Sequence, residues 1–200
     1  MGTLMTSIRA TLVILSLFTL LLGIAYPLGM TKLATLLFPY QAGGSLIRDD
    51  KNTVIGSALI GQSFTDPKYF WGRPSSTGTM PYNAAASSGS NLSTSNPALR
   101  DAVRVRVAAL KAADPENTMP IPVDLVTASA SGLDPSISPA SAYYQMDRIA
   151  RIRHLNRSDL ELIIKDNTIP RRFGVLGEPA VNVFAMNRAL DTLVSIRTEE

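Results

Sequence analysis

The run ATLVILSLFTLLLGIAYPLGMT occupies residues 10–31 and contains no charged side chain, although Arg9 and Lys32 flank it directly. As an α-helix, these 22 residues would measure about 33 Å, against about 30 Å for the hydrocarbon core of a bilayer. Tyr26 suits the membrane interface, and Pro27 is expected to kink or end the helix. The run predicts an N-terminal segment over residues 1–32 with one transmembrane helix, followed by an extramembrane domain over residues 33–200.

A cleaved signal peptide is the alternative explanation of this run. The apolar region of a signal peptide has about 7–15 residues and ends at small residues that form a cleavage site. The present run is longer and continues through residues 26–34 without such a site. We therefore expect an uncleaved anchor. The positive-inside rule does not choose its orientation, because Arg9 lies on one side and Lys32 and Arg48 lie on the other.

Composition excludes several classes of protein. The chain has 200 residues, enough for one domain with a core and an appendage, and it carries 19 basic and 16 acidic side chains. Subtracting Arg9 and Lys32 leaves 17 basic and 16 acidic side chains in residues 33–200. Because nucleic-acid-binding domains usually carry a basic stripe, we expect no nucleic-acid partner, despite a local basic stretch over residues 148–157. The absence of cysteine excludes disulfides, thiol nucleophiles and cysteine-based metal sites.

Residues 33–200 alternate helical and strand patterns, which favours an α+β domain. Helices are expected to begin at the cap-plus-proline pairs Asn96-Pro97 and Ser138-Pro139, and at a capping box over residues 158–161. The first of these helices should end at residues 114–117, and a last helix should cover residues 186–194. Short strands are expected within residues 52–61, 121–127 and 181–184.

An uncharged stretch of 26 residues, rich in Ser, Thr, Asn, Gly and Ala, covers residues 74–99. Such composition is typical of a flexible low-complexity loop. An ordered loop is the alternative, because Ser, Thr and Asn side chains satisfy nearby backbone groups. Met80, Tyr82 and Leu92 interrupt the polar pattern and are consistent with packing against another surface.

The chain contains no recognisable catalytic motif. It has no P-loop, no GxGxxG after a strand and no GxSxG elbow. Its one histidine, His154, is expected to be a cation at a helix end. Ser129, Ser131 and Asp134 share one loop, for which turn formation is the simpler explanation. A membrane-anchored extracytoplasmic hydrolase that uses Ser131 and His154 remains one alternative, and an anchored binding module is another.

Several short runs occur together in the order and spacing of one family. They are GSLI (44–47), GSALIGQ (56–62), YF (69–70), RPS (73–75), PYN (81–83), SSGSN (87–91), NP (96–97), PVDLVTASASGLDP (122–135), ISP (137–139), GEP (177–179), VNV (181–183) and Asn187. Through them the chain resembles, over nearly its whole length, the KdpC family. This family comprises the C subunits of Kdp-type potassium-transporting P-type ATPases.

The resemblance implies an accessory subunit and not an enzyme, and the aspartyl-phosphate motif is absent as expected. Such a subunit joins a P-type ATPase subunit, a potassium-channel-like subunit and a small membrane subunit in the bacterial cytoplasmic membrane. It is described as a catalytic chaperone that supports assembly and raises the ATP affinity of the ATPase subunit, with Gln62 as the implied nucleotide contact. No tightly bound cofactor and no metal site are expected.

The resemblance also places the main domain outside the cytoplasmic membrane, where it cannot touch cytoplasmic ATP. An effect on ATP affinity would then be a coupling between conformations, whereas direct contact through Gln62 needs the opposite orientation. We expect the outside placement, because the uncharged stretch suits docking on a partner. The residues expected in family motifs or partner contacts are Gly61, Gln62, Tyr69, Phe70, Arg73, Pro74, Tyr82, Asn83, Ser90, Asn91, Asn96, Asp124, Ser131, Gly132 and Asp134.

Overall fold

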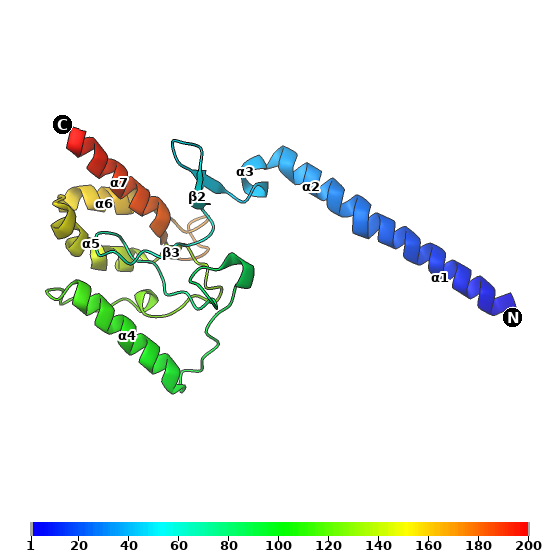
Figure 1. The fold of residues 1–200 in the computed structure, drawn as a ribbon, viewed down its shortest axis with the longest axis horizontal. Coiled ribbons are helices and arrows are strands. Elements are labelled where there is room, and N and C mark those ends of the chain that lie inside the picture. Colours follow the sequence, from blue (N-terminus) through cyan, green and yellow to red (C-terminus); the bar gives the residue numbers. More distant parts are fainter. Residues whose placement is uncertain (1, 200) are drawn as a thin grey trace. The chain divides into compact units, whose positions relative to one another are not determined.

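A computed structural model gives the fold of the 200-residue chain. It describes the backbone of residues 2–199 and the side chains of residues 4–195. The chain divides into two compact units, of which the first ends at Leu46 and the second begins at Ile47. A long apolar helix followed by mixed helices and strands confirms the predicted α+β class (Figure 1).

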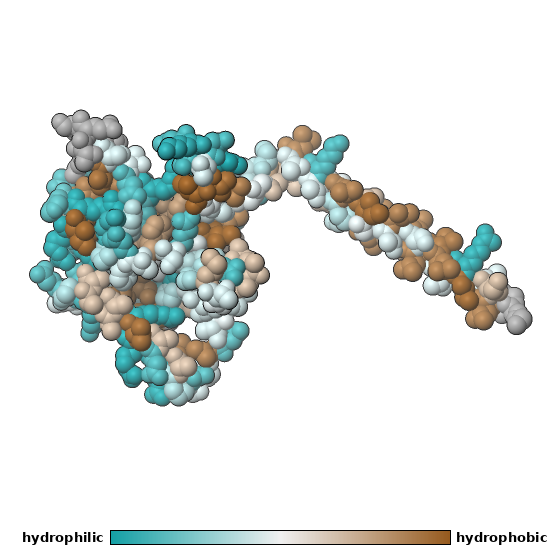
Figure 2. All heavy atoms as spheres, in the orientation of Figure 1, coloured by the Kyte–Doolittle hydropathy of each residue, from teal (hydrophilic) through white to brown (hydrophobic). Residues whose placement is uncertain are grey.

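One helix makes up most of the first unit. It runs without interruption through α1 (Gly2–Leu20), a π-helical turn (Leu21–Ala25) and α2 (Tyr26–Leu37). Residues Leu4–Leu37 have the length and composition of a membrane span, with a mean hydropathy of 2.2 over their most apolar window. Figure 2 shows hydrophobic surface along this helix, and the described domain buries none of that window. The predicted N-terminal membrane helix is therefore present as a candidate span.

A kink or an end of the helix was expected at Pro27. The helix does not end there. Proline lacks an N–H, and its ring collides with the carbonyl group four residues earlier in a regular α-helix. The backbone widens directly before Pro27, where the N–H of Tyr26 bonds to the carbonyl of Leu21. This π-helical turn lets the chain continue as a helix to Leu37.

Two small antiparallel sheets follow. A short helix, α3 (Pro39–Ala42), precedes β1 (Leu46–Arg48) and β2 (Val54–Ser57), which pair with each other. The second sheet has the order β3-β5-β4, in which Ser136 lies opposite Asn182 and Thr168 lies opposite Val181. Its strands are β3 (Ser136–Ile137), β4 (Thr168–Ile169) and β5 (Ala180–Asn182).

Three helices build the core of the second unit together with the central strand β5. They are α5 (Pro139–Arg153), α6 (Arg157–Asp166) and α7 (Val183–Glu199), and Figure 1 shows them together on one side of the domain. The fourth, α4 (Pro97–Ala113), contributes one buried residue, Leu110, and lies apart from them along another edge. The largest fully buried apolar side chains are Phe70, Ile137, Met146, Ile149, Leu160, Ile164, Val181, Met186 and Leu190.

Two of the three predicted helix starts are confirmed. Asn96 accepts a hydrogen bond from the N–H of Ala98 at 2.9 Å, and Ser138 accepts one from Ser141 at 3.1 Å. The capping box predicted over residues 158–161 is wrong, because α6 already begins at Arg157 after Asn156. The predicted end of α4 is also confirmed, with Asp114 as its C-cap residue.

The strands are shorter than the sequence predicts. Within residues 52–61 only Val54–Ser57 is a strand, and the last helix begins at Val183 directly after β5. The strand predicted over residues 121–127 is wrong, because Val123–Leu125 forms a 3₁₀ helix instead. Asp124 within that turn accepts hydrogen bonds from Ser138 at 2.7 Å (backbone N–H) and 3.2 Å (hydroxyl), which hold it against the start of α5.

Two buried amide side chains attach the extended segment around Phe70 to this core. Asn187 accepts from the N–H of Phe70 and donates to its carbonyl, both at 2.9 Å. Gln145 likewise accepts from the N–H of Trp71 at 2.8 Å and donates to its carbonyl at 3.1 Å. Both amides are almost fully buried. The segment is thus held as a strand would be, by side chains of α7 and α5 in place of a neighbouring backbone.

A guanidinium group completes this arrangement. Arg148, also buried, lies 4.5 Å from the centre of the Trp71 ring and donates to the Gln145 side chain at 2.8 Å and to the Tyr69 carbonyl at 3.0 Å. Burial lowers the pKa of Arg148 to about 10, which still leaves it protonated at neutral pH.

We expect Leu15→Arg to prevent stable membrane insertion. A charged side chain near the middle of a membrane helix costs about 2.5–3.5 kcal/mol on insertion scales. Leu36→Arg is the matched control, because Leu36 lies one residue before the helix end, near Lys32, where a long cation reaches the interface. Carbonate-resistant membrane protein, measured by immunoblot, should fall for Leu15→Arg alone; equal levels of both variants would contradict the anchor.

We expect Asn187→Ala to destabilise the domain strongly. It leaves the buried N–H and carbonyl of Phe70 unpaired, which costs about 1–3 kcal/mol for each group. Thr192→Ala on the exposed face of the same helix is the control and should change the free energy of unfolding by about 0.5 kcal/mol or less. Urea unfolding of the full chain, followed by the fluorescence of its one tryptophan, measures both. Equal stabilities would show that the amide is not a structural clamp.

Candidate functional site

Four of the predicted residues meet at one cluster of loops. The N–H of Gly61 donates to the carbonyl of Leu133 at 2.9 Å. A methyl group added to Gly61 would lie 2.3 Å from the Tyr82 ring, so only glycine fits between these loops. The Tyr82 hydroxyl donates to the carbonyl of Arg73 at 2.6 Å. Gly61, Arg73, Tyr82 and Asp134 thus belong to one assembly, although 73 positions separate the first from the last.

An ion pair fixes the centre of this loop cluster. The Arg73 guanidinium lies 3.1 Å from the Asp134 carboxylate, and both side chains are about 70% buried. Arg73 also donates to the carbonyl of Ala128 at 3.3 Å, whereas Asp134 accepts from the N–H of Ser136 at 3.0 Å. The carboxylate therefore fixes the start of β3 as well as the arginine.

Burial raises the pKa of Tyr82 to about 12, and the nearby Asp134 carboxylate acts in the same direction. Tyr82 is therefore a neutral hydrogen-bond donor at physiological pH.

The uncharged stretch is ordered where it passes this cluster. Ser75 donates to the carbonyl of Gly132 at 2.7 Å and accepts from the N–H of Tyr82 at 2.9 Å. Thr77 is buried and donates to the carbonyl of Met80 at 2.7 Å. The alternative of an ordered, packed loop is confirmed for residues 75–83, where hydroxyl groups satisfy the backbone locally.

The loop of Ser129, Ser131 and Gly132 is a turn, as the simpler interpretation predicted. Gly132 has a φ of +68°, and its N–H donates to the Ser129 hydroxyl at 2.9 Å. The Ser131 hydroxyl accepts from the N–H of Leu133 at 3.1 Å. His154 is the left-handed C-cap of α5, and within the described residues no hydrogen bond or ion pair joins it to Ser131. The geometry gives no support to a hydrolase that uses this pair.

Tyr69 and Phe70 do not belong to the loop cluster. The Tyr69 hydroxyl donates to the Asp191 carboxylate at 3.0 Å, and Arg153 lies 4.6 Å from the centre of its ring. Phe70 is fully buried in the core. Both residues therefore attach this segment to α5 and α7.

The remaining predicted residues have mainly local roles. The Gln62 side-chain amide donates to the carbonyl of Ile55 at 2.7 Å, so this donor is already engaged within the domain. Asp124 is the hydrogen-bonding anchor described above. Asn83 and Asn96 cap short and long helices respectively. Ser90 and Asn91 are exposed, as is most of the stretch that surrounds them.

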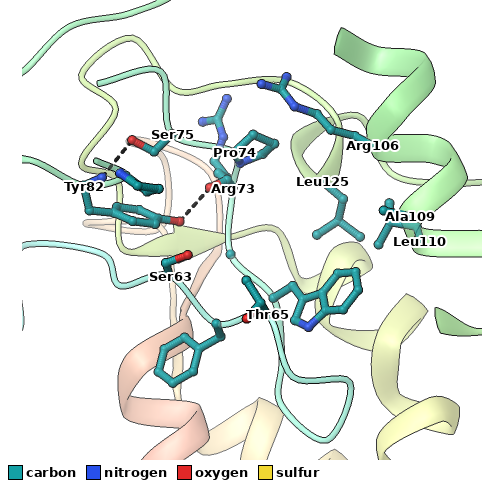
Figure 3. Close-up of a pocket in the computed structure, with 14 residues that line it drawn as sticks. Ser63, Thr65, Arg73, Pro74, Ser75, Tyr82, Arg106, Ala109, Leu110 and Leu125 are labelled. Atoms are coloured by element: carbon teal, nitrogen blue, oxygen red, sulfur yellow. Dashed lines mark hydrogen bonds between the residues drawn. The ribbon is translucent and has the colours of Figure 1, made fainter. Parts of the chain in front are cut away.

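A pocket of about 450 Å³ opens beside the loop cluster. It lies between the extended segment after Ser63 and the inner side of α4, and Figure 3 shows Arg106 extending from α4 toward Arg73 and Pro74. Its lining is mostly apolar and consists of Ser63, Phe64, Thr65, Trp71, Gly72, Arg73, Pro74, Ser75, Pro81, Tyr82, Arg106, Ala109, Leu110 and Leu125.

Sequence patterns did not single out the most exposed apolar group of the domain. A hairpin over residues 171–178 is closed by the Arg172–Leu176 bridge and by an Arg171–Glu178 ion pair of 2.6 Å. At its tip Phe173 is 91% exposed and Val175 is 73% exposed. In the sequence, the alternation of glycine with apolar residues over 173–177 gives no sign that these apolar side chains would point to solvent.

Three of the four arginines in the basic stretch over residues 148–157 pair with carboxylates. Arg151 pairs with Asp114, Arg153 pairs with Asp191 at 2.8 Å, and Arg157 pairs with Asp147 at 2.7 Å. Within the described residues, no group of three or more His, Cys, Asp or Glu side chains is placed to hold a metal ion.

Comparison with known proteins identifies the family. The sequence model described as "K+-transporting ATPase, c chain" (KdpC) matches residues 8–192, which include the apolar helix, the loop cluster and the pocket. This chain belongs to the KdpC family. Among its relatives, the potassium-transporting ATPase KdpC subunit of Dechloromonas aromatica is 56% identical over 188 residues, covering 94% of this chain and 98% of the relative. The KdpC subunit of Methylococcus capsulatus is 57% identical over 185 residues, covering 92% and 97%.

The family match agrees with the resemblance inferred from short motifs. The KdpC subunit of Variovorax paradoxus is 55% identical over 190 residues, with 95% of this chain and 98% of the relative covered. This alignment therefore spans nearly all of both sequences.

We expect Gly132→Ala to disrupt the loop cluster. Besides its positive φ, a new methyl group would lie 2.6 Å from the Thr77 side chain and 2.7 Å from the Ser88 carbonyl. Gly174→Ala is the control, because its φ is +76° and no atom lies within 4 Å of the new methyl group. The control should lose about 1–2 kcal/mol through backbone strain alone, and Gly132→Ala should lose clearly more in urea unfolding. Equal losses of unfolding free energy in the two variants would show that residues 77 and 88 shift to accommodate the methyl group at little cost.

Proposed function

We propose that the chain is a non-catalytic accessory subunit of an ATP-driven potassium import complex in the bacterial cytoplasmic membrane. The observation that carries this proposal is the family match over residues 8–192, which includes a candidate membrane span. Full-length relatives are named as KdpC subunits of a potassium-transporting ATPase. Its partners are then a P-type ATPase subunit, a potassium-channel-like subunit and a small membrane subunit.

The chemistry of the domain supports a role without catalysis. The polar residues that sequence analysis selected serve the fold: Arg73 and Asp134 pair with each other, Ser131 closes a turn and Asp124 anchors α5. Catalysis of phosphoryl transfer needs carboxylates that hold magnesium and a cradle for the phosphates. Among the described residues, no group of three or more His, Cys, Asp or Glu side chains is placed to hold a metal ion.

We propose that the subunit supports assembly and raises the ATP affinity of its ATPase partner through a coupling between conformations. With the domain on the extracytoplasmic side, Gln62 would not contact the nucleotide. The bond from its amide to Ile55 agrees with a structural role. A free energy of coupling can pass between sites on opposite sides of a membrane only if both bias the same conformational equilibrium. The 171–178 hairpin and the exposed residues 84–91 are the surfaces proposed to contact the partner subunits.

Affinity purification of the tagged chain from its native membrane in mild detergent tests this role. The ATPase and channel-like subunits should co-purify with potassium-stimulated ATP hydrolysis. Phe173→Ser should reduce their recovery about tenfold, as loss of an exposed apolar anchor does in many interfaces. Leu162→Ser removes an apolar side chain with 57% exposure on α6 and should not reduce recovery. Recovery of the chain alone, under conditions that keep other complexes intact, would contradict the role.

The side of the membrane is tested separately. External protease added to intact spheroplasts should cleave within the domain and leave the N-terminal helix protected. Protection of the whole domain until the cells are lysed would place it in the cytoplasm and would reopen direct nucleotide contact through Gln62.

A further inference from the structure

The pocket beside α4 has a cationic end. Arg106 donates to the carbonyl of Val126 at 2.9 Å, and Arg73 donates to the carbonyl of Ala128 at 3.3 Å. These carbonyls lie two residues apart, so they are at most about 7 Å apart along the chain. Figure 3 shows both arginine side chains toward the same end of the pocket. Two arginine side chains that line the pocket are thus held by the same short stretch of chain, residues 126–128.

One of these two cations lacks a counterion. Arg73 pairs with Asp134, whereas the described residues offer no ion pair to Arg106, and no carboxylate lines the pocket. Burial lowers the pKa of Arg106, which agrees with a cation partly withdrawn from water. The neighbourhood therefore favours a negatively charged group.

The rest of the pocket is apolar. Trp71, Phe64, Leu110 and Leu125 line it, with the small side chain of Ala109 on the α4 side. The volume of about 450 Å³ lies within the range of small-ligand pockets. A few hydroxyl groups, such as those of Ser63 and Thr65, are the other polar features of the lining.

We propose that this pocket binds a small amphiphile, with an anionic head group on Arg106 and an apolar body against Trp71, Leu110 and Leu125. Carboxylate and phosphate monoester head groups share the required chemistry, because each accepts several hydrogen bonds from a guanidinium group. The site belongs to the extramembrane domain and does not depend on the accessory role proposed above.

Binding to the full chain in phosphatidylcholine nanodiscs tests the proposal. Trp71 lines the pocket and is the one tryptophan of the chain, so its fluorescence reports occupancy directly. Titration with sodium octanoate should give a saturable change, and titration with octyl phosphate shows which head group binds more tightly. Octylammonium, with the same apolar body and the opposite charge, should give no saturable change.

Three variants locate the site. Arg106→Gln should weaken octanoate binding about tenfold or more through loss of the charge-assisted contact. Arg104→Gln on the same helix removes an exposed arginine that pairs with Asp101, and it should bind as the wild type does. Ala109→Phe should fill the pocket and abolish saturation without any change of charge. Partition of octanoate into the nanodisc lipid is the same for all variants, so it cannot produce these differences.

Three outcomes would overturn the proposal. The first is a linear, non-saturable fluorescence change for octanoate and octyl phosphate. The second is saturable binding that Arg106→Gln and Ala109→Phe leave unchanged. The third is equal binding of octylammonium, which would mean that the pocket selects an apolar body without regard to charge. A non-saturable change would mean that the pocket holds a protein side chain or water instead of a small amphiphile.

Discussion

Hydrogen bonds from two buried amides to one extended segment are the constraint on which the rest of the domain depends. Asn187 and Gln145 each satisfy both backbone groups of one residue, Phe70 and Trp71 respectively. The extended segment therefore lies in the core without a partner strand. Because unpaired buried backbone groups are costly, these four hydrogen bonds fix the position of the segment.

The loop cluster and the pocket follow from that placement. Because Trp71 is fixed, the next residues bring Arg73 to Asp134 and to the carbonyl of Ala128. Tyr82 then closes over the Arg73 carbonyl, and only Gly61 leaves room for its ring. The same segment forms one wall of the pocket and α4 forms the other. A ligand or a partner that moved this segment would change both features together.

The domain combines a rigid interior with surfaces that remain available for contact. Among the described residues, buried amides, turn hydroxyls and ion pairs hold the core and the loop cluster together. The exposed Phe173 tip and the uncompensated Arg106 are different, because neither contributes to the core. One exposes apolar surface to water and the other keeps a cation partly desolvated, and a bound partner or ligand would reduce both costs.

Sequence alone predicted the apolar helix, the α+β class, the caps at Asn96 and Ser138 and the family, because length, local capping and motif order are properties of adjacent residues. It did not predict the 3₁₀ helix at residues 123–125, from which the Asp124 side chain accepts a hydrogen bond from the distant Ser138. Nor did it show which of the matched residues meet. Only tertiary structure joined Gly61, Tyr82 and Asp134 and aligned Arg106 with Arg73, since these contacts cross long stretches of chain that carry no local pattern.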